Sequence, residues 1–307
     1  MPAPVNNINS ELQLVVILDT VMRAFKRRLL PVLAFSTVFR NVQLAGTDKV
    51  AVPYYPLYAT GSTDFDKDAG YQFTGSNGTS VRDVTINKRK YMSLAVTSSD
   101  YRRQPQLRPD QLLQMRAEKL AEDVIGDIFS VVTAANYGAS ACEVAPASFD
   151  SNDVTDIRGA CNVAMWPKTG RSLILNSDYD TALFKDGDVK LVHAIGDNQT
   201  IREGSIPRLL GFDYHDSPIL PENNERLVGV ATYASALLTA FSPITPHPDV
   251  AARLTRYEIM SDEETGLSLE YRAWGDPDSD TAKAVIECNY GYNFGEKAAL
   301  KRITRPA

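Results

Sequence analysis

The stretch "PDQLLQMRAEKLAEDVIGDIFSVVT", residues 109–133, predicts one long helix on which the rest of the fold is organised. Pro109 suits the first turn of a helix, and apolar residues then recur at helical spacing. This stripe consists of Leu113, Ala117, Leu120, Val124, Ile128 and Val131. At about 1.5 Å per residue the run is about 37 Å long, well above the mean helix of roughly 11 residues. We therefore expect a central helix that organises a fold rather than a pocket.

Two extended runs before this helix predict a projecting β-hairpin. They are "DKVAVPYYPLYA" (48–59) and "VRDVTINKRKYMSLAV" (81–96), separated by a Gly/Ser/Thr/Asp stretch. Pro53 and Pro56 place the first run at a sheet edge or outside a sheet core, because proline donates no ladder hydrogen bond. A dozen residues at about 3.3 Å each give an arm of roughly 40 Å. Because a two-stranded arm alone is marginally stable in water, we expect another element to pack against it.

Charge is separated along this predicted arm. The tip "STDFDKDAGYQF" (62–73) is acidic, and the return strand with its exit is basic. The acidic residues are Asp64, Asp66 and Asp68, and the basic ones include Lys88, Arg89, Lys90, Arg102 and Arg103. Two interpretations remain open. The tip of one subunit pairs with the base of a neighbour, or the charges pair within one hairpin or are simply solvated.

The alternating aspartates also suggest a calcium-binding loop, but the pattern fits poorly. An EF-hand loop needs glycine at its sixth position and a bidentate glutamate at its twelfth. Counted from Asp64, these positions hold Ala69 and Gly75. The solvated acidic tip is therefore the better interpretation.

A second helix is expected near the start of the chain, over residues 10–29. Ser10 and Gln13 form a possible capping box, and Pro31 is expected to stop or kink the helix. Its last turn carries Lys26, Arg27 and Arg28. These cations either complement the helix dipole or contact an acidic partner.

The remainder predicts a mixture of helices and strands. Helices are expected in "DVTDIRGACNVAM" (153–165), "SDYDTALF" (177–184, capped by Ser177 or Asp178) and "YASALLTAF" (233–241). Strands are expected in "RSLILN" (171–176), "RLTRYEIM" (253–260), "LSLEYRAW" (267–274) and "TAKAVIECNYGYNF" (281–294). The order indicates an α+β fold that ends mainly in strands.

Composition and motifs exclude several function classes. The net charge of −6 does not indicate a dedicated nucleic-acid binder, and no apolar run is long enough to span a membrane. The three cysteines, Cys142, Cys161 and Cys288, are too few and too widely spaced for a disulfide framework or a CxxC metal site. No HExxH, GxSxG, phosphate-loop or dinucleotide motif occurs. We expect no catalytic site, metal or cofactor; the weak metal candidate is His215 with Asp213 and Asp216.

The segment "TIREGSIPRLLGFDYHDSPILPENN" (200–224) resembles a recurring segment of the major capsid proteins of tailed double-stranded DNA bacteriophages. In that family a glycine and an apolar turn lead into a Gly-Phe pair and a Leu-Pro pair. The matching positions here are Gly204, Leu209, Gly211, Phe212, Ser217, Leu220 and Pro221. Glycine permits a tight turn, which we expect here between a helix and a strand.

The resemblance extends in order over nearly the whole chain and implies a division into five parts. These are an N-terminal arm with the start of a peripheral domain (1–45), an extended loop (46–104), the spine helix of the peripheral domain (105–138), an axial domain (139–250) and the peripheral-domain strands (251–307). The acidic tip and basic base of the loop would then make intersubunit contacts. Gly204, Gly211, Phe212 and Pro221 would form a turn of the axial domain.

The resemblance also implies a function. The chain is expected to assemble into pentamers and hexamers of an icosahedral phage head in the host cytoplasm, with scaffolding and portal proteins as partners and only non-specific contact to packaged DNA. Some members crosslink through a lysine and an asparagine, for which Lys67 and Asn289 are weak candidates. The alternatives are an encapsulin-type shell around protein cargo and, from another class, a cytosolic α/β enzyme.

Overall fold

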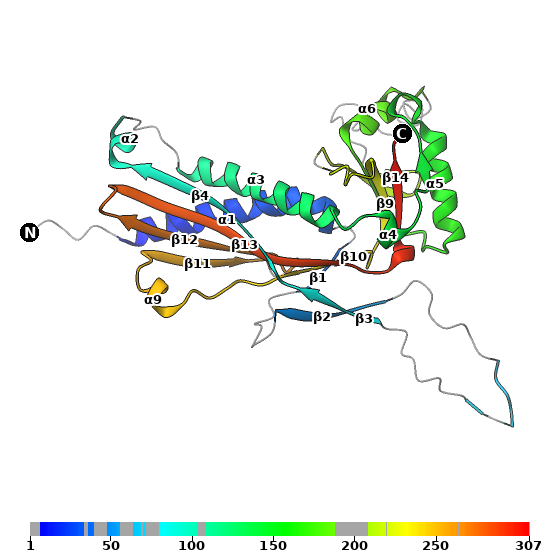
Figure 1. Cartoon of the computed structure of the whole chain (residues 1–307), viewed down its shortest axis with the longest axis horizontal. Helices are drawn as coiled ribbons and strands as arrows, with labels where there is room; N and C mark the ends of the chain where they lie inside the picture. The colour runs from blue at the N-terminus through cyan, green and yellow to red at the C-terminus, as the bar shows by residue number, and fades with distance from the viewer. Residues whose placement is uncertain are drawn as a thin grey trace, which may run out of the picture.

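The fold is an elongated α+β structure built on two sheets (Figure 1). The computed structural model describes residues 7–33, 36–39, 48–55, 64–68, 70–71, 80–103, 109–187, 208–218, 220–262 and 265–306. The larger sheet has the order β1-β10-β13-β12-β11, with β4 paired to the free edge of β13. The second sheet has the order β5-β14-β9-β6-β8-β7.

The long strand β13 (Thr281–Phe294) is the centre of the larger sheet. Along one edge it pairs with β4 (Lys88–Thr97). Along the other edge it pairs first with β12 (Ser268–Asp276) and then with β10 (Leu237–Phe241). The outer strands are β11 (Arg256–Ser261), next to β12, and β1 (Ser36–Phe39), next to β10. The strands predicted at 253–260, 267–274 and 281–294 are confirmed.

Two helices cover one face of this sheet, α1 (Asn7–Leu33) and α3 (Pro109–Phe129) (Figure 1). The predicted stripe of α3 is buried from Leu113 to Ile128, while Val131 is half-buried beyond the helix end. The helix ends at Phe129, four residues before the predicted end. The carbonyl oxygen of Phe129 accepts a 2.6 Å hydrogen bond from the Asn223 side chain. The β-branched run that follows also disfavours helix.

The first helix differs from the prediction at both ends. It starts before Ser10, which therefore lies inside the helix and is not its N-cap, and it continues through Pro31 to Leu33. A proline so near the end removes few helical hydrogen bonds, so the helix does not stop there. The expected acidic partner of its basic turn lies in the same chain, since Arg27 and Arg28 pair with Glu118 of α3 at 3.3 and 3.8 Å.

The second sheet packs with α5 (Ser151–Val163) and α6 (Ser177–Lys185). Its strands are β5 (Cys142–Glu143), β6 (Arg171–Leu175), β7 (Arg208–Leu209), β8 (Phe212–Asp216), β9 (Leu227–Tyr233) and β14 (Leu300–Thr304). The helices and the strand β6 were predicted. The predicted N-cap of α6, Ser177 or Asp178, is wrong. The N-cap is Asn176, whose side chain accepts a hydrogen bond from the backbone N–H of Tyr179.

Two strands lie in a different sheet from the one their sequence position suggested. The segment 233–241 was predicted to be a helix within 139–250, but it forms a turn and then β10 of the larger sheet. A fully buried strand and a buried helix present the same apolar run, so periodicity does not separate them. Conversely, β14 falls in the range 251–307 but pairs with β9 of the second sheet.

The predicted hairpin is confirmed at its base, but its return strand is divided. Among the described residues, β2 (Lys49–Tyr54) pairs with β3 (Ser80–Thr85), whereas β4 leaves the hairpin and joins the larger sheet. The base of the hairpin packs on that sheet, where Val52 and Val84 cover Leu238 of β10.

Short elements complete the fold. They are the helices α2 (Ser98–Arg103), α4 (Ala134–Tyr137) and α9 (Pro248–Ala251) and the 3₁₀ turns η1 (Pro146–Ser148) and η2 (Lys297–Ala299). Of these, α9 lies in the segment that connects β10 to β11.

Candidate intersubunit surfaces

The face of the larger sheet opposite α1 and α3 is polar at its centre. Side chains alternate along β12 and β13, so Leu269, Tyr271 and Ile286 face the helices while Glu270 and Glu287 face away. Both glutamates are nevertheless buried, at 1% and 3% exposure. Burying a carboxylate costs free energy unless it is paired and hydrogen-bonded, so we expect each of these glutamates to have charged or polar partners.

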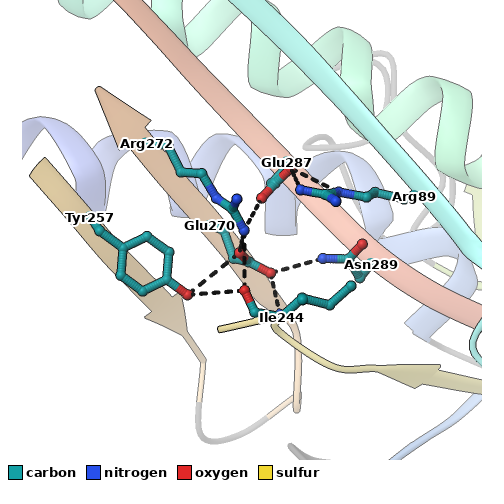
Figure 2. A network of polar contacts seen from close by, with 7 residues as sticks. All are labelled: Arg89, Ile244, Tyr257, Glu270, Arg272, Glu287 and Asn289. Carbon is teal, nitrogen blue, oxygen red and sulfur yellow. Dashed lines mark hydrogen bonds and ion pairs between the residues drawn. The ribbon is translucent and has the colours of Figure 1, made fainter. Parts of the chain in front are cut away.

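The Glu270 carboxylate accepts hydrogen bonds from four groups (Figure 2). One carboxylate oxygen accepts from the backbone N–H of Ile244 at 2.5 Å and from the Asn289 amide at 2.8 Å. The other accepts from Arg272 at 2.7 Å and from the Tyr257 hydroxyl at 3.5 Å. The contact with Ile244 fastens the segment between β10 and α9 across the sheet.

Glu287 stands opposite Glu270 in the register of β12 and β13 and lies between two arginines (Figure 2). Its oxygens lie 2.6 Å from Arg272 and 2.6 Å from Arg89 of β4. Two carboxylates and two guanidinium groups make the cluster neutral. Burial, followed by the neighbouring Glu270 carboxylate, raises the pKa of Glu287, although the arginines oppose the shift.

Sequence reasoning missed Glu270, Glu287 and Arg272. In the sequence, charged residues do occur at every second position in two consecutive predicted strands. Such alternation ordinarily marks a solvent-facing side, so nothing in the pattern indicated burial.

The predicted crosslinking residue Asn289 belongs to this cluster. It is 2% exposed, and its amide nitrogen donates to Glu270. The Asn289 amide is therefore buried and already engaged with Glu270 of its own chain. Lys67 is exposed on the loop.

Next to the cluster the same face opens into a groove of about 990 Å³. Its walls include apolar groups of β4, β12 and β13 on one side and of the α9 segment on the other. The main apolar lining consists of Tyr91, Trp274, Val285, Val250 and Leu254. Tyr91 is 63% exposed and Val250 is 47% exposed, so substantial apolar surface is open to solvent.

The acidic tip of the loop is exposed at Asp64, Asp66 and Asp68. A side-chain oxygen of Asp66 accepts from the backbone N–H of Asp68 at 2.9 Å, and Gly70 donates to the Asp66 carbonyl oxygen at 2.8 Å. The tip is therefore a compact turn rather than an extended end.

The basic residues predicted at the base of the loop lie on different faces of the larger sheet and have different partners. Arg89 is bound to Glu287, and Lys90 reaches the other face to contact Asp127 at 3.0 Å. Lys88 and Arg103 are exposed, and the side chain of Arg102 lies outside the described residues. These cations therefore do not form one patch.

Of the predicted axial-domain turn, Gly211 and Phe212 lie together where β7 turns into β8. Gly211 has φ +91° in the tight turn between β7 and β8, so this turn joins two strands and not a helix to a strand. Phe212 is fully buried, and Pro221 is half-buried after β8. Gly204 lies outside the described residues.

Metal-binding groups and membrane-spanning helices were sought in the part of the chain that the structure describes. There, no group of three or more His, Cys, Asp or Glu side chains could hold a metal ion, and no helix is long and apolar enough to cross a membrane. Cys142, Cys161 and Cys288 are free thiols, and burial raises the pKa of Cys142 and Cys161 to about 11.

No family model matches the sequence, and no curated protein matches it. Solved structures do match. The capsid of cyanophage P-SCSP1u aligns with a TM-score of 0.60 at 12% identity, covering 88% of this chain and 86% of that one. The mature capsid of bacteriophage PhiM1 aligns with a TM-score of 0.57 at 9% identity, covering 89% and 86%.

A virus-like particle from Pyrococcus furiosus also matches, with a TM-score of 0.54 at 11% identity over 93% of this chain and 96% of that one. Each of these alignments covers between 86% and 96% of both chains compared. The chain therefore has the fold of the major capsid proteins of tailed bacteriophages.

Proposed function

We propose that this chain is a major capsid protein that self-assembles into an icosahedral phage head enclosing double-stranded DNA. The observation that carries the proposal is a fold shared with phage capsids over nearly nine-tenths of the chain. Conservation of so irregular an architecture, at about a tenth sequence identity, favours a shared structural role over a shared reaction.

In this proposal the larger sheet with α1 and α3 is the peripheral domain, and the second sheet with α5 and α6 is the axial domain. The loop beyond β2 and β3 reaches a neighbouring subunit. Its acidic residues Asp64, Asp66 and Asp68 provide intersubunit contact, together with exposed cations such as Lys88 and Arg103. Pentamers and hexamers result, and many weak contacts sum to a stable shell.

The expected partners are a scaffolding protein, a portal protein and packaged DNA. Because the chain carries a net charge of −6, contact with DNA is non-specific and slight. Assembly takes place in the host cytoplasm, and the final location is the virion.

A protein-cargo shell of the encapsulin type is the second candidate, and the match to the Pyrococcus furiosus virus-like particle favours it. The two functions differ in what the particle encloses. Particles that protect double-stranded DNA from nuclease support the phage head, and particles that copurify with a defined protein cargo support the compartment shell.

Negative-stain electron microscopy of the purified chain, alongside its mass in solution, tests the proposal. Closed shells, pentamers or hexamers are expected. A chain that stays monomeric even with its scaffolding protein, and whose melting temperature rises with a small-molecule ligand, would instead be the cytosolic enzyme.

A further inference from the structure

The strand β11 leaves one edge of the larger sheet open. It pairs with β12 on one side, and no other described strand pairs with its outer side (Figure 1). Its sequence, "RYEIMS", contains no proline, and its register with β12 is unbroken. Proline and bulges are common ways in which proteins protect a sheet edge, so β11 remains able to pair with a further strand.

The unpaired backbone groups of this edge belong to alternate residues. Asp262, directly after the strand, donates its N–H to the carbonyl oxygen of Leu267 across the hairpin. Because backbone hydrogen bonds alternate along an antiparallel pair, the even-numbered residues of β11 direct their N–H and C=O groups toward β12. The odd-numbered residues therefore direct theirs outward.

Space is available beside this edge. A groove of about 980 Å³ runs between β11 and α1, and every residue of the strand lines it. Leu18, Asp19 and Met22 of α1 form the other wall. An extended segment can therefore reach the outward backbone groups, which is the recognition mode known as β-strand addition.

The side chains of β11 carry a pair of charges that is complementary to itself. Arg256 and Glu258 lie two residues apart and share one face of the sheet. Glu258 is exposed and Arg256 is half-buried, and neither forms an ion pair with the described residues. When two β11 strands run antiparallel with Tyr257 opposite Tyr257, Arg256 of each copy faces Glu258 of the other. One isologous contact then contains two ion pairs.

Neighbouring registers lack this match. Moving the two-fold axis by one residue places Glu258 opposite Glu258 or Arg256 opposite Arg256, and like charges directly opposite each other are destabilising. Moving the axis by two residues, to Ile259, places Arg256 opposite Asp262, which is already bound to Lys26 of α1 at 2.8 Å. The register centred on Tyr257 is therefore favoured.

We propose that β11 pairs antiparallel with β11 of a second copy of this chain, about a two-fold axis at Tyr257, so that the two larger sheets become continuous. The outward backbone groups of the two Tyr257 residues bond to each other, and the Arg256–Glu258 pairs lie on either side. The inference rests on the proposed function and adds to it an interface between subunits in which the extended loop takes no part.

Mixing two variants of opposite charge tests the pairing. Arg256→Glu places glutamate opposite glutamate in both pairs, and Glu258→Arg places arginine opposite arginine, so each variant alone should associate about tenfold more weakly than wild type. A one-to-one mixture should restore association, because a chain with two glutamates then meets a chain with two arginines. Sedimentation velocity and shell yield over a series of chain concentrations measure the association.

The matched control moves the same charges to another surface. Arg158→Glu and Asp156→Arg change two exposed residues that are likewise two positions apart, on α5. Both control variants should associate like wild type, alone or mixed. Circular dichroism and the melting temperature of each variant show that the monomer folds.

Disulfide trapping tests the register. Arg256 and Glu258 would occupy a non-hydrogen-bonded pair with Cα atoms about 4.5 Å apart, within the reach of a disulfide. Chains carrying Arg256→Cys and chains carrying Glu258→Cys are mixed and oxidised with diamide, and linked dimers are expected on non-reducing gels. Val163→Cys, 84% exposed on α5, replaces Arg256→Cys as the control. Each single variant alone measures the background from the native thiols and from other registers.

The outcomes separate the inference from the proposed function. Association restored by mixing, with links between positions 256 and 258, supports the pairing. Shells that form equally well from each charge variant, a loss that mixing does not restore, or stronger links from Glu258→Cys alone overturn it and leave the capsid function standing. A wild-type chain that forms no oligomer of any kind, even with its scaffolding protein, overturns both.

Discussion

At Glu287 a carboxylate lies in the middle of a sheet with 3% of the residue exposed. Its neighbours Arg89 and Arg272 balance the charge of this group and of Glu270. Such a cluster contributes little net stability compared with apolar packing, but it penalises any strand register that separates the partners. We infer that it holds β4, β12 and β13 in one alignment.

The pH dependence of unfolding is the first prediction. Burial raises the pKa of Glu287, so the folded state binds this proton more tightly than the unfolded chain does. The stabilising contribution is therefore complete below the ordinary pKa of a glutamate and is lost as pH rises through the raised pKa. The variant Glu287→Gln lacks this titrating carboxyl group. The difference between the free energies of unfolding, wild type minus variant, should therefore fall as pH rises.

Chemical denaturation at a series of pH values between about 4 and 8 measures this difference, because the series begins near the ordinary pKa of a glutamate, about 4.3, and covers the pH range above it. Asp276→Asn is the matched control of opposite sign, because hydrogen bonding to Lys283 and Ser279 lowers the pKa of Asp276 to about 2. A difference that rises with pH for Glu287→Gln would contradict the prediction.

Gly291 supplies a second prediction at the scale of one residue. A Cβ atom here would lie 2.2 Å from the carbonyl oxygen of Thr85, where the chain leaves β3 and crosses β13. Gly291→Ala therefore forces the backbone apart and should lower the free energy of unfolding by about 1–3 kcal/mol. Gly275→Ala, in β12 with no atom within 4 Å, is the control and should stay close to wild type in the same denaturant titration.

At the scale of elements, the hairpin of β2 and β3 is attached to the larger sheet by a small core of its own. Val52 and Val84 are fully buried against β10, and the Arg82 guanidinium lies 3.8 Å from the centre of the Phe294 ring. Asn293 adds a 2.9 Å hydrogen bond to the Asp83 carbonyl oxygen. The base of the loop is thus positioned by β10 and β13.

Removing part of this core should loosen the hairpin without unfolding the sheet. Val84→Ala creates a cavity under β3, with an expected cost of about 2 kcal/mol. Amide hydrogen exchange should accelerate in 49–54 and 80–85 while β12 and β13 stay protected. Val81→Ala in the same strand is the control, since Val81 is 62% exposed; equal acceleration in both variants would contradict the role assigned to the small core.

At the scale of the whole molecule, the exposed acidic tip belongs to assembly rather than to the stability of one chain. Asp64→Lys with Asp66→Lys should impair shell formation while the melting temperature of the monomer stays unchanged, because neither carboxylate is in an ion pair among the described residues. Electron microscopy and calorimetry measure the two effects. Glu143→Lys with Asp156→Lys, an equal change of charge at exposed sites on the second sheet and α5, is the control. Normal shells from the tip variant would show that the tip makes no essential contact.

The sequence by itself determined the elements whose pattern repeats locally. The stripe of α3, the alternation of β12 and β13 and the acidic turn at the loop tip could all be predicted, because each follows from helix or strand geometry over a few turns or residues. The α+β class followed from them.

Only the tertiary structure decided what depends on contacts between distant residues. Pairing with β13 turned the apolar run 237–241 into a strand, and pairing with β9 placed β14 in the second sheet. The alignment of β4, β12 and β13 buried Glu270 and Glu287 beside their arginines and opened the groove next to them. Local pattern carries no information about which strands become neighbours, so the candidate surface could not be predicted from the residues that form it.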